Sequence, residues 1–471
     1  EKRMLDKGIR PHSVRSLSQD QMTNQYIYSS IGIGYRDKKE EIIPDLLPQD
    51  LMNLEYRLVS TIFKLTQKEP PVVVVVAPQE RVNIAPQVRQ MMMQMGQQVP
   101  ETEDPYSYLQ KILESEKYSV QRVEISQASP LPEEFDTLVV VDPRQLNERQ
   151  RWEIGRAIVG GKSVVLAVQN REFDYEVTRQ GLSLNQRDET PNINPLLENY
   201  GITVSLEHLM DVNHIALNVS TGGGQGLAAL LNMGQPIDLP THMLINNETM
   251  DADTSITGRL STVLYLWGSP LVLDKGKFAE LGLDVKTLMR TTEGAWTAST
   301  MTQEAIQEPD SGEAYPLMVL AHGQFPDAYD GQERPAWPPP APQQQFGQPA
   351  MPPPAEDGEP GELVPAPAKL VVIGGAEMWR DNFIDPRSGG PGNFDLFLNT
   401  VDAVTLGDDL LNVRGHKPID RIIASPSTSK KTRWKLINYG LAISVISAAG
   451  IFTTLARCRS RNAYTLAHGV D

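Results

Sequence analysis

The run VVVVVA at residues 72–77 decides the fold class of this 471-residue chain. A continuous series of β-branched residues without polar alternation is typical of a central strand that is buried on both faces of a parallel sheet. Three comparable runs follow: SVQRVEI at 119–125, DTLVVVD at 136–142 and SVVLAVQ at 163–169. Two intervening segments are long enough to form helices: 105–117 and 146–159. Strands alternating with helices predict an α/β domain over residues 69–415, with an open, mostly parallel sheet flanked by helices.

A proline-rich insertion interrupts the second half of this domain. Further strand-like stretches occur at 201–205, 260–266, 317–321 and 370–373. Between the last two, residues 335–367 contain twelve prolines, a Gln run and the acidic segment EDGE. Such a composition buries too little apolar surface to order itself, which predicts a disordered loop. We expect this loop to join two strands of one sheet; a polyproline segment that docks a partner is the alternative.

Residues 1–68 are expected to form a strand followed by a helix. The stretch YIYSSIGIGY at 26–35 is rich in β-branched and aromatic residues, as strands are. After it, apolar residues recur at helical spacing from Leu51 to Leu65, and Asp50 suits the N-cap position before them.

A last helix is predicted near the end of the domain. Its apolar residues follow the spacing of one helix face: Phe394, Phe397, Leu398, Val401 and Val404. Asn393 offers an N-cap, Asp395 complements the helix dipole, and Gly407 suits the C′ position. This helix is predicted to be the last one before the C-terminal connector.

The overall charge and the cysteine content restrict the kinds of partner. With 43 Lys and Arg against 59 Asp and Glu, the chain carries a formal charge of −16. No excess of positive charge is present to displace counterions from phosphates, so we expect no nucleic-acid binding. The single cysteine, Cys458, excludes an internal disulfide, a Cys-rich zinc module and an iron–sulfur cluster. No cofactor is predicted.

Residues 436–456 are predicted to form a transmembrane helix. The segment from Leu436 to Ala456 carries no charge, and its length matches the roughly 20 residues that cross a bilayer as a helix. Basic clusters flank it in the connector 416–435 and in the tail 457–471. The alternative is a buried helix of a soluble domain, but such a helix seldom has basic clusters at both ends. We therefore expect one C-terminal span in the cytoplasmic (inner) membrane, with the lipid bilayer as a partner. Four basic residues precede the span and three follow it, so its orientation stays open.

Two glycine-rich motifs suggest nucleotide binding, but their spacing does not support it. GGKS at 160–163 lacks the first glycine of a phosphate loop and leads into a strand instead of a helix, so we expect a helix cap and a tight turn. GGGQG at 222–226 lacks the spacing of a dinucleotide-binding loop and is expected to be a flexible loop.

Potential metal ligands are scarce. His208 and His214, beside Glu207 and Asp211, are the one cluster worth naming as a metal site, although a surface hairpin with scattered polar residues is the stronger interpretation. MMMQM at 91–95 is expected to belong to a helix or a mobile loop, with a soft-metal or partner surface as the alternative. No metal site is therefore predicted.

Any ligand pocket is expected at the ends of the parallel strands. Open parallel sheets bind ligands outside the carboxyl ends of their strands. Five polar residues stand at these positions: Gln79, Asp142, Arg144, Gln169 and Asn170. They mark a place without an assigned chemistry, and Asp142 with Pro143 is also compatible with a simple strand-ending turn.

The ordered series of motifs resembles the GldG-like auxiliary components of ABC-type transport systems, a family associated with gliding motility. The resemblance rests on YIYSSIGIGYRDKKEEIIP, NLEYRLVSTIFKL, PPVVVVVAP, DTLVVVDP, GGKSVVLAV, NPLLENYGITV, KLVVIGGAEMWRDNFI and GNFDLFLNTVDAVTLGDDLLNVRGHK, followed by the terminal span. It covers most of residues 20–461. It implies a domain distantly like a class I glutamine amidotransferase, held outside the cytoplasmic membrane beside an ABC permease and ATPase. The long insertion departs from the family pattern, and the sheet lacks a cysteine nucleophile.

These observations together predict a protein that is not an enzyme. The first hypothesis is a membrane-anchored accessory subunit of an ABC-type transport or gliding-motility complex, which presents an extracytoplasmic α/β domain to a partner or substrate. The alternative is an extracytoplasmic hydrolase that acts on a peptide or glycan near Asp142 and Gln169. A structural anchor without a ligand pocket is a third possibility. The transported substrate and the oligomeric state stay open.

Overall fold

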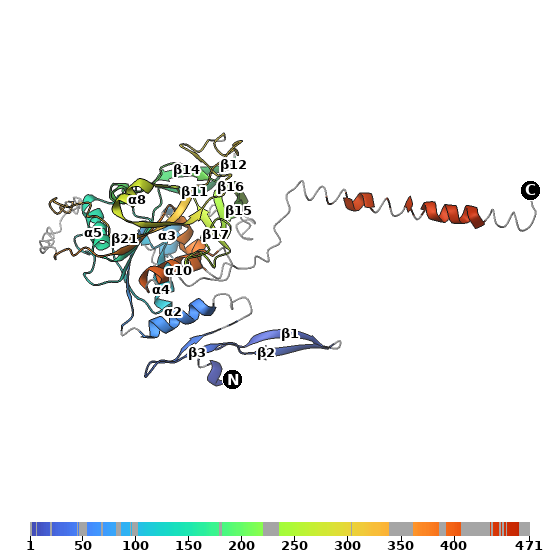
Figure 1. Ribbon diagram of the computed structural model, residues 1–471, viewed down its shortest axis with the longest axis horizontal. Helices are drawn as coiled ribbons and strands as arrows, with labels where there is room; N and C mark the ends of the chain where they lie inside the picture. The colour runs from blue at the N-terminus through green and yellow to red at the C-terminus, as the bar shows by residue number, and fades with distance from the viewer. Residues whose placement is uncertain are drawn as a thin grey trace, which may run out of the picture. The chain divides into compact units, whose positions relative to one another are not determined.

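The computed structural model (Figure 1) describes most of residues 2–406 and parts of the C-terminal segment. The described residues are 2–5, 7–18, 21–44, 46, 54–66, 69–81, 86–94, 96, 102–178, 181–219, 235–302, 304–338, 361–385, 392–406, 434, 437–441, 444, 447–448 and 450–460. The chain divides into two compact units, Glu1–Pro418 and Ile419–Asp471.

A seven-stranded sheet lies at the centre of the first unit, in the order β19-β21-β22-β10-β9-β5-β8. Its strands are β5 (Val72–Val76), β8 (Ser119–Arg122), β9 (Thr137–Val141), β10 (Ser163–Ala167), β19 (Asp284–Arg290), β21 (Pro316–Gly323) and β22 (Ala368–Ile373). The five strands from β22 to β8 are mutually parallel. The predicted α/β class is confirmed.

The far edge of the sheet differs from the prediction because β21 runs antiparallel to both β22 and β19. The sheet is therefore mixed. Antiparallel neighbours need no crossover helix. The described parts of the insertion between β21 and β22 contain no helix that could have carried the chain back for a parallel pairing. The proline-rich stretch thus connects two strands that are neighbours in the sheet.

Helices cover both faces of the sheet, which explains why its central strands are apolar throughout. Val73 and Val75 face a core that includes residues of α4 (Ser107–Ser115) and α10 (Asn393–Thr405). Val74 faces the opposite core, with residues of α5 (Glu148–Val159) and α6 (Asn194–Leu197). A strand between two helical layers has no solvent face, so polar alternation is lost.

The GGKS motif ends α5 and begins β10. Asn147 and Gln150 form a capping box at the start of the helix, and Gly160 is its C-cap. Gly161 adopts φ +83°, and Lys162 N donates to Ala157 O (2.9 Å), which closes the last turn. The predicted helix cap and turn are confirmed.

The predicted N-cap of α10 is wrong. Gly392 is the N-cap, and Asn393 is the first helical residue. The fully buried Asn393 side chain instead joins two other elements, since its Oδ1 accepts from Leu264 N (2.9 Å) and its Nδ2 donates to Met378 O (3.0 Å). The Asn393 side chain thus makes tertiary hydrogen bonds instead of capping the helix. Gly407, predicted at C′, lies outside the described residues.

Two stretches predicted as strands lie outside the central sheet. β13 (Ile202–Val204) pairs antiparallel with β18 (Leu271–Leu273). β17 (Thr262–Leu266) joins a three-stranded antiparallel sheet with β15 (His214–Val219) and β16 (Gln235–Asn246). The other described elements of this region are β6 (Glu80–Arg81), β7 (Thr102–Glu103), β11 (Arg171–Thr178), β12 (Gly181–Asp188), β14 (His208–Met210), β20 (Trp296–Ala298), α3 (Pro86–Gln94), α8 (Lys275–Leu281), α9 (Asp381–Ile384), η2 (Glu198–Tyr200) and η3 (Glu377–Trp379).

The N-terminal part contains two hairpins and a helix. Its elements are α1 (Lys2–Leu5), β1 (His12–Ser18), β2 (Gln21–Ile27), β3 (Ile31–Ile33), β4 (Glu41–Ile43) and α2 (Leu54–Thr66). The single strand predicted at 26–35 is wrong, because β2 ends at Ile27 and β3 pairs separately with β4. The helix predicted before Leu65 is confirmed as α2, whereas Asp50 lies outside the described residues.

Six of the 21 residues of the predicted transmembrane segment lie outside the described residues. Residues 436, 442–443, 445–446 and 449 are among those not described, as are most of the connector and tail. Residues 450–460 are helical, and Ile451, Phe452 and Leu455 are exposed on them. Within the described residues, no helix has both the length and the apolar character needed to span a bilayer.

Both described ends of the proline-rich insertion are fastened to α5. Arg149 donates to Pro335 O (3.0 Å), and Arg156 donates to Gly361 O (2.7 Å). The guanidinium groups of both arginines also lie over the Trp152 ring, within 5 Å of its centroid. Residues 339–360, the middle of the predicted loop, lie outside the described residues.

Candidate functional site

The carboxyl ends of the parallel strands carry an ionic cluster. Asp142 follows β9 directly, and Arg144 stands two residues later. We use the name carboxyl-edge cluster for Glu80, Asp142, Arg144, Glu172, Glu189, Glu377 and Arg380. Of the five predicted residues, Asp142 and Arg144 belong to it, whereas Gln79 beside it is exposed.

Two arginines hold this cluster together. Arg144 pairs with Asp142 (2.7 Å), Glu80 (2.8 Å) and Glu189 (3.3 Å). Arg380 pairs with Glu80 (2.6 Å), Glu172 (3.2 Å) and Glu377 (3.3 Å). Glu80 thus bridges the two guanidinium groups, and each arginine is surrounded by carboxylates. Their guanidinium pKa values are accordingly raised, against the opposing effect of burial.

Asp142 is the most constrained member of the cluster. It is 2% exposed and adopts a left-handed φ of +50°. Its Oδ2 accepts from Tyr106 OH (3.3 Å) as well as from Arg144, while its buried Oδ1 has no hydrogen-bond partner among the described residues. Burial raises the pKa of Asp142 to about 6, although Arg144 opposes the rise. Burial likewise raises the pKa of Glu377 to about 6.

The cluster therefore contains more carboxyl groups than arginines can neutralise. Its five acidic side chains face two buried arginines and the largely exposed Arg187, which contacts Glu172 and Glu189. As the pH falls towards 6, such an arrangement takes up protons on its least solvated carboxyls. Chemically it can hold and release protons. Among the described residues, no aliphatic hydroxyl or thiol nucleophile lies in hydrogen-bond contact with its carboxylates.

Gln169 and Asn170, at the end of β10, are tied to neighbouring loops. Gln169 Oε1 accepts from Ala376 N (2.8 Å) and Glu377 N (3.2 Å), and its Nε2 donates to Trp267 O (3.0 Å). Asn170 Nδ2 donates to Ser205 O (2.8 Å). The Gln169 side chain thus connects the ends of β10 and β22 and does not face an open space.

A hollow of about 390 Å³ opens beside Asn170 at the same edge of the sheet. It is lined by Gln145, Asn170, Thr190, Pro191, Asn192, Ile193, Asn194, Pro195 and Leu206, which are all uncharged. We call it the amide hollow. It brings Asn170, one of the predicted strand-end residues, together with the loop after Arg144.

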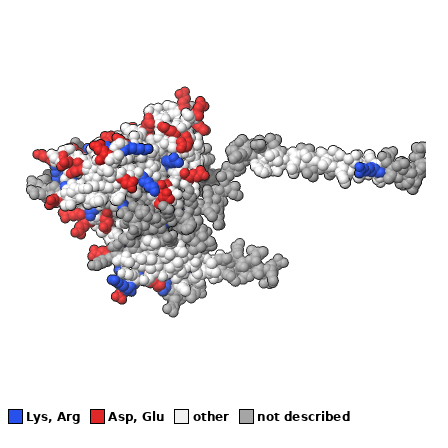
Figure 2. All heavy atoms as spheres, in the orientation of Figure 1, with Lys and Arg blue, Asp and Glu red and all other residues white. Residues whose placement is uncertain are grey.

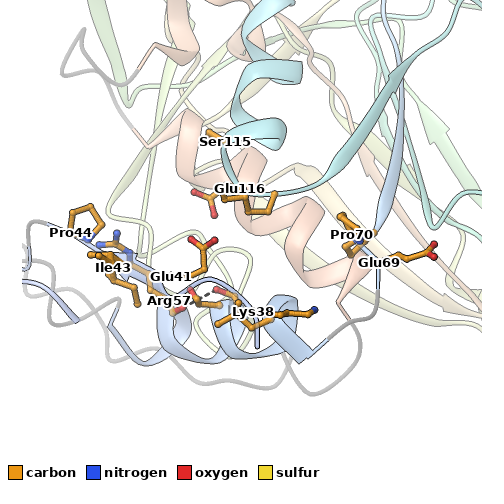
Figure 3. Close-up of a pocket in the computed structure, with 15 residues that line it drawn as sticks. Lys38, Glu41, Ile43, Pro44, Arg57, Glu69, Pro70, Ser115 and Glu116 are labelled. Atoms are coloured by element: carbon orange, nitrogen blue, oxygen red, sulfur yellow. Dashed lines mark hydrogen bonds between the residues drawn. The ribbon is translucent and has the colours of Figure 1, made fainter. Parts of the chain in front are cut away.

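A second hollow of about 500 Å³ lies near the amino end of β5, between β4 and α2 on one side and the end of α4 on the other. Figure 3 shows the carboxylates of Glu41 and Glu116 facing one another across it, above the helix that carries Arg57. Lys38 and Lys117 also line it, so both signs of charge are present. It lies away from the carboxyl-edge cluster, and sequence reasoning did not foresee it because its walls are distant in sequence.

The candidate metal cluster is not assembled. Asp211 accepts from Thr292 N (2.8 Å) and Thr292 Oγ1 (2.6 Å), and burial lowers the pKa of His208 to about 4. The predicted surface hairpin is wrong, since β14, with His208, pairs with β20, and β15, with His214, pairs with β16. Among the described residues, no group of three His, Cys, Asp or Glu side chains is placed to hold a metal ion.

The other motifs are simple to place. Met91 and Met93 lie exposed on α3, in agreement with the expected helix. Residues 222–226 lie outside the described part of the chain.

Sequence reasoning missed five of the seven residues of the carboxyl-edge cluster, and two of these five were within reach. Glu377 and Arg380 follow β22, a strand that the sequence predicted at 370–373, so the strand-end rule applied to that strand would have found both. Glu80 and Glu172 carry no comparable signal, because only the pairing of distant loops brings them to the arginines.

Comparison with known families adds one finding. A family model described as "ABC-type uncharacterized transport system" matches residues 70–401, which include the central sheet and the carboxyl-edge cluster. No curated protein matches the chain.

Proposed function

Because the chain belongs to the family described as ABC-type uncharacterized transport system, we propose that it is a non-catalytic, membrane-anchored accessory subunit of an ABC-type transport complex. The match over residues 70–401 is the observation that carries this proposal. A GldG-like role beside an ABC permease and ATPase, in transport or gliding motility, is its finer form.

Membrane attachment is part of the proposal and rests on the sequence. The uncharged stretch 436–456 between two basic clusters has the length of one span. Under this proposal, the α/β domain lies outside the cytoplasm. Acidic side chains far outnumber basic ones on the face of the first unit seen in Figure 2, which suits contact with a basic partner.

The geometry of the carboxyl-edge cluster does not favour catalysis. Its arginines are engaged by several carboxylates each, and Gln169 is consumed by backbone hydrogen bonds. Ion pairs and hydrogen bonds formed within the protein fix loop positions, whereas a catalytic group needs access to a substrate atom. Asp142, at 2% exposure, has little such access.

Affinity purification from detergent-solubilised membranes tests the proposal. The full chain is expected to retain the co-encoded permease and ATPase. A chain that ends at residue 418 is expected to appear in the aqueous fraction without these two subunits. The full chain remaining in the aqueous fraction after lysis, or purifying without either subunit, would contradict the proposal.

A hydrolase is the second candidate, and the raised pKa of Asp142, about 6, is the observation that favours it, since a general acid works best near the ambient pH. Asp142→Asn and Glu377→Gln separate the two functions. A hydrolase loses activity in both variants while its complex persists, whereas an accessory subunit supports transport in both.

A further inference from the structure

We propose that the amide hollow is a preformed docking site for an uncharged, extended peptide segment, held through its backbone N–H groups and one apolar side chain. This inference rests on the proposed function in one respect, namely that the domain binds a partner or substrate. Peptide docking at this site requires neither a membrane nor an ATPase.

The position of the hollow favours a ligand site. It lies at the carboxyl edge of β9 and β10, where open α/β sheets bind their ligands. Four separate chain segments close around it, and a space of about 390 Å³ falls within the size range of ligand pockets.

Three asparagine side chains of the hollow have their amide nitrogens engaged. The amide nitrogens of Asn170, Asn192 and Asn194 donate to backbone oxygens of Ser205, Leu146 and Val204, at 2.8, 2.8 and 2.9 Å. Within the described part of the chain, no hydrogen bond engages Oδ1 of Asn170 or Asn192. These two oxygens can accept hydrogen bonds from the N–H groups of a ligand, and the Gln145 amide and the Thr190 hydroxyl, which also line the hollow, can donate to its carbonyl groups.

The walls are held in a strained backbone conformation. Gln145, Thr190 and Asn192 all have left-handed φ values, +49°, +41° and +55°. The left-handed region is least favourable for a β-branched residue such as Thr190. The conformation is maintained by the pairing of Gln145 N with Thr190 O (3.2 Å) and of Leu146 N with Pro191 O (3.3 Å). Backbone strain that the surroundings maintain is typical of ligand sites, because it fixes the site before binding.

The charge and polarity of the residues that line the hollow restrict the class of ligand. No charged side chain and no aromatic ring is among the lining residues, so an ion lacks a counter-charge and a sugar ring lacks a stacking partner. Pro191, Pro195 and Leu206 supply apolar contact, and Leu206 is 65% exposed without a bound ligand. Acceptors for backbone N–H groups beside an apolar surface match an uncharged peptide.

Saturation-transfer NMR on the full chain in detergent micelles tests the inference. The probe is a pool of N-acetylated, C-amidated hexapeptides of Gly and Ser with one Leu or Val, and maltotriose serves as the polyol probe. The peptides are expected to receive saturation from the wild-type chain. Leu206→Ser is expected to weaken binding about tenfold by removing the apolar contact, whereas Val364→Ser, an equally exposed aliphatic position elsewhere, leaves binding unchanged.

A second variant guards against a folding artefact. Thr190→Gly relieves the left-handed strain, so its melting temperature is expected not to fall, while the loosened wall binds the peptides more weakly. Peptide binding that is absent in the wild type, or equal in all variants, overturns the inference. Maltotriose binding in place of peptide binding also overturns it and assigns a polyol site.

The proposed function fails separately from this inference. Its own readout is copurification with the permease and ATPase. A chain that binds the peptides but copurifies with neither subunit retains the site and loses the proposed function; the opposite pair of results retains the function and loses the site.

Discussion

At the scale of single residues, Asp142 illustrates how burial and pairing compete. Arg144 and Tyr106 both hydrogen-bond its Oδ2, and each contact favours a fixed side chain. Burial nevertheless dominates and raises its pKa from 3.8 to about 6. The residue therefore costs folding free energy when it is ionised at neutral pH, and its position at the end of β9 is maintained by the surrounding network.

This balance predicts the pH dependence of stability. The folded state binds the proton more tightly than the unfolded state, so the contribution of Asp142 to the free energy of unfolding falls as pH rises from about 4 to about 6. Between pH 5 and pH 7, the wild type should lose about 1 kcal/mol in the free energy of unfolding that Asp142→Asn does not lose. Urea unfolding of both proteins at the two pH values measures this difference. Parallel pH profiles would show that Asp142 titrates at its ordinary pKa.

At the scale of elements, the turn between α5 and β10 determines how closely helix and sheet approach. Gly161 has φ +83°, and a Cβ at this position would lie 2.7 Å from the Cβ of Ala366. Ala366 in turn donates its N–H to Val159 O (2.9 Å) at the end of the helix. The second glycine of GGKS is thus required by packing against the residues that precede β22.

Replacement of this glycine should be costly. Gly161→Ala combines a left-handed alanine with a steric clash, and we expect a loss of about 3 kcal/mol in the free energy of unfolding. Gly282→Ala is the matched control, because Gly282 ends α8 with φ +68° and a Cβ at that position would meet no neighbouring atom within 4 Å. The control should lose only about 1 kcal/mol. Equal losses in denaturant titrations would refute the role of the Ala366 contact.

At the scale of the whole molecule, the core is drawn from residues 72–406 and can be traced to the pattern that decides the fold class. Apolar runs predicted the parallel strands, the segments between them left room for α4 and α5, and helical spacing predicted α10, because all three signals are local. The antiparallel β21 and the buried role of Asn393 were not predictable, since each depends on a distant partner. Within the carboxyl-edge cluster, only the residues that directly follow a predicted strand could be predicted.

A chain that ends at Pro418 should therefore fold independently. Both large core clusters lie before that residue, so the truncated chain is expected to keep the melting temperature of the full chain within about 2 °C. Differential scanning calorimetry of the two proteins provides the measurement. A lower melting temperature of the truncated chain would show that the C-terminal unit contributes to the stability of the first.

The attachment of the proline-rich insertion to α5 has a consequence for engineering. Arg149 and Arg156 receive the two ends of the insertion, and they stand seven residues apart on one helix, a rise of about 10 Å. The β21–β22 register therefore does not depend on the sequence between residues 339 and 360. Doubling the length of such a segment costs only about 0.6 kcal/mol in loop-closure entropy. The segment is therefore a suitable insertion site, where an epitope tag or a fluorescent reporter can be added without disturbing the sheet.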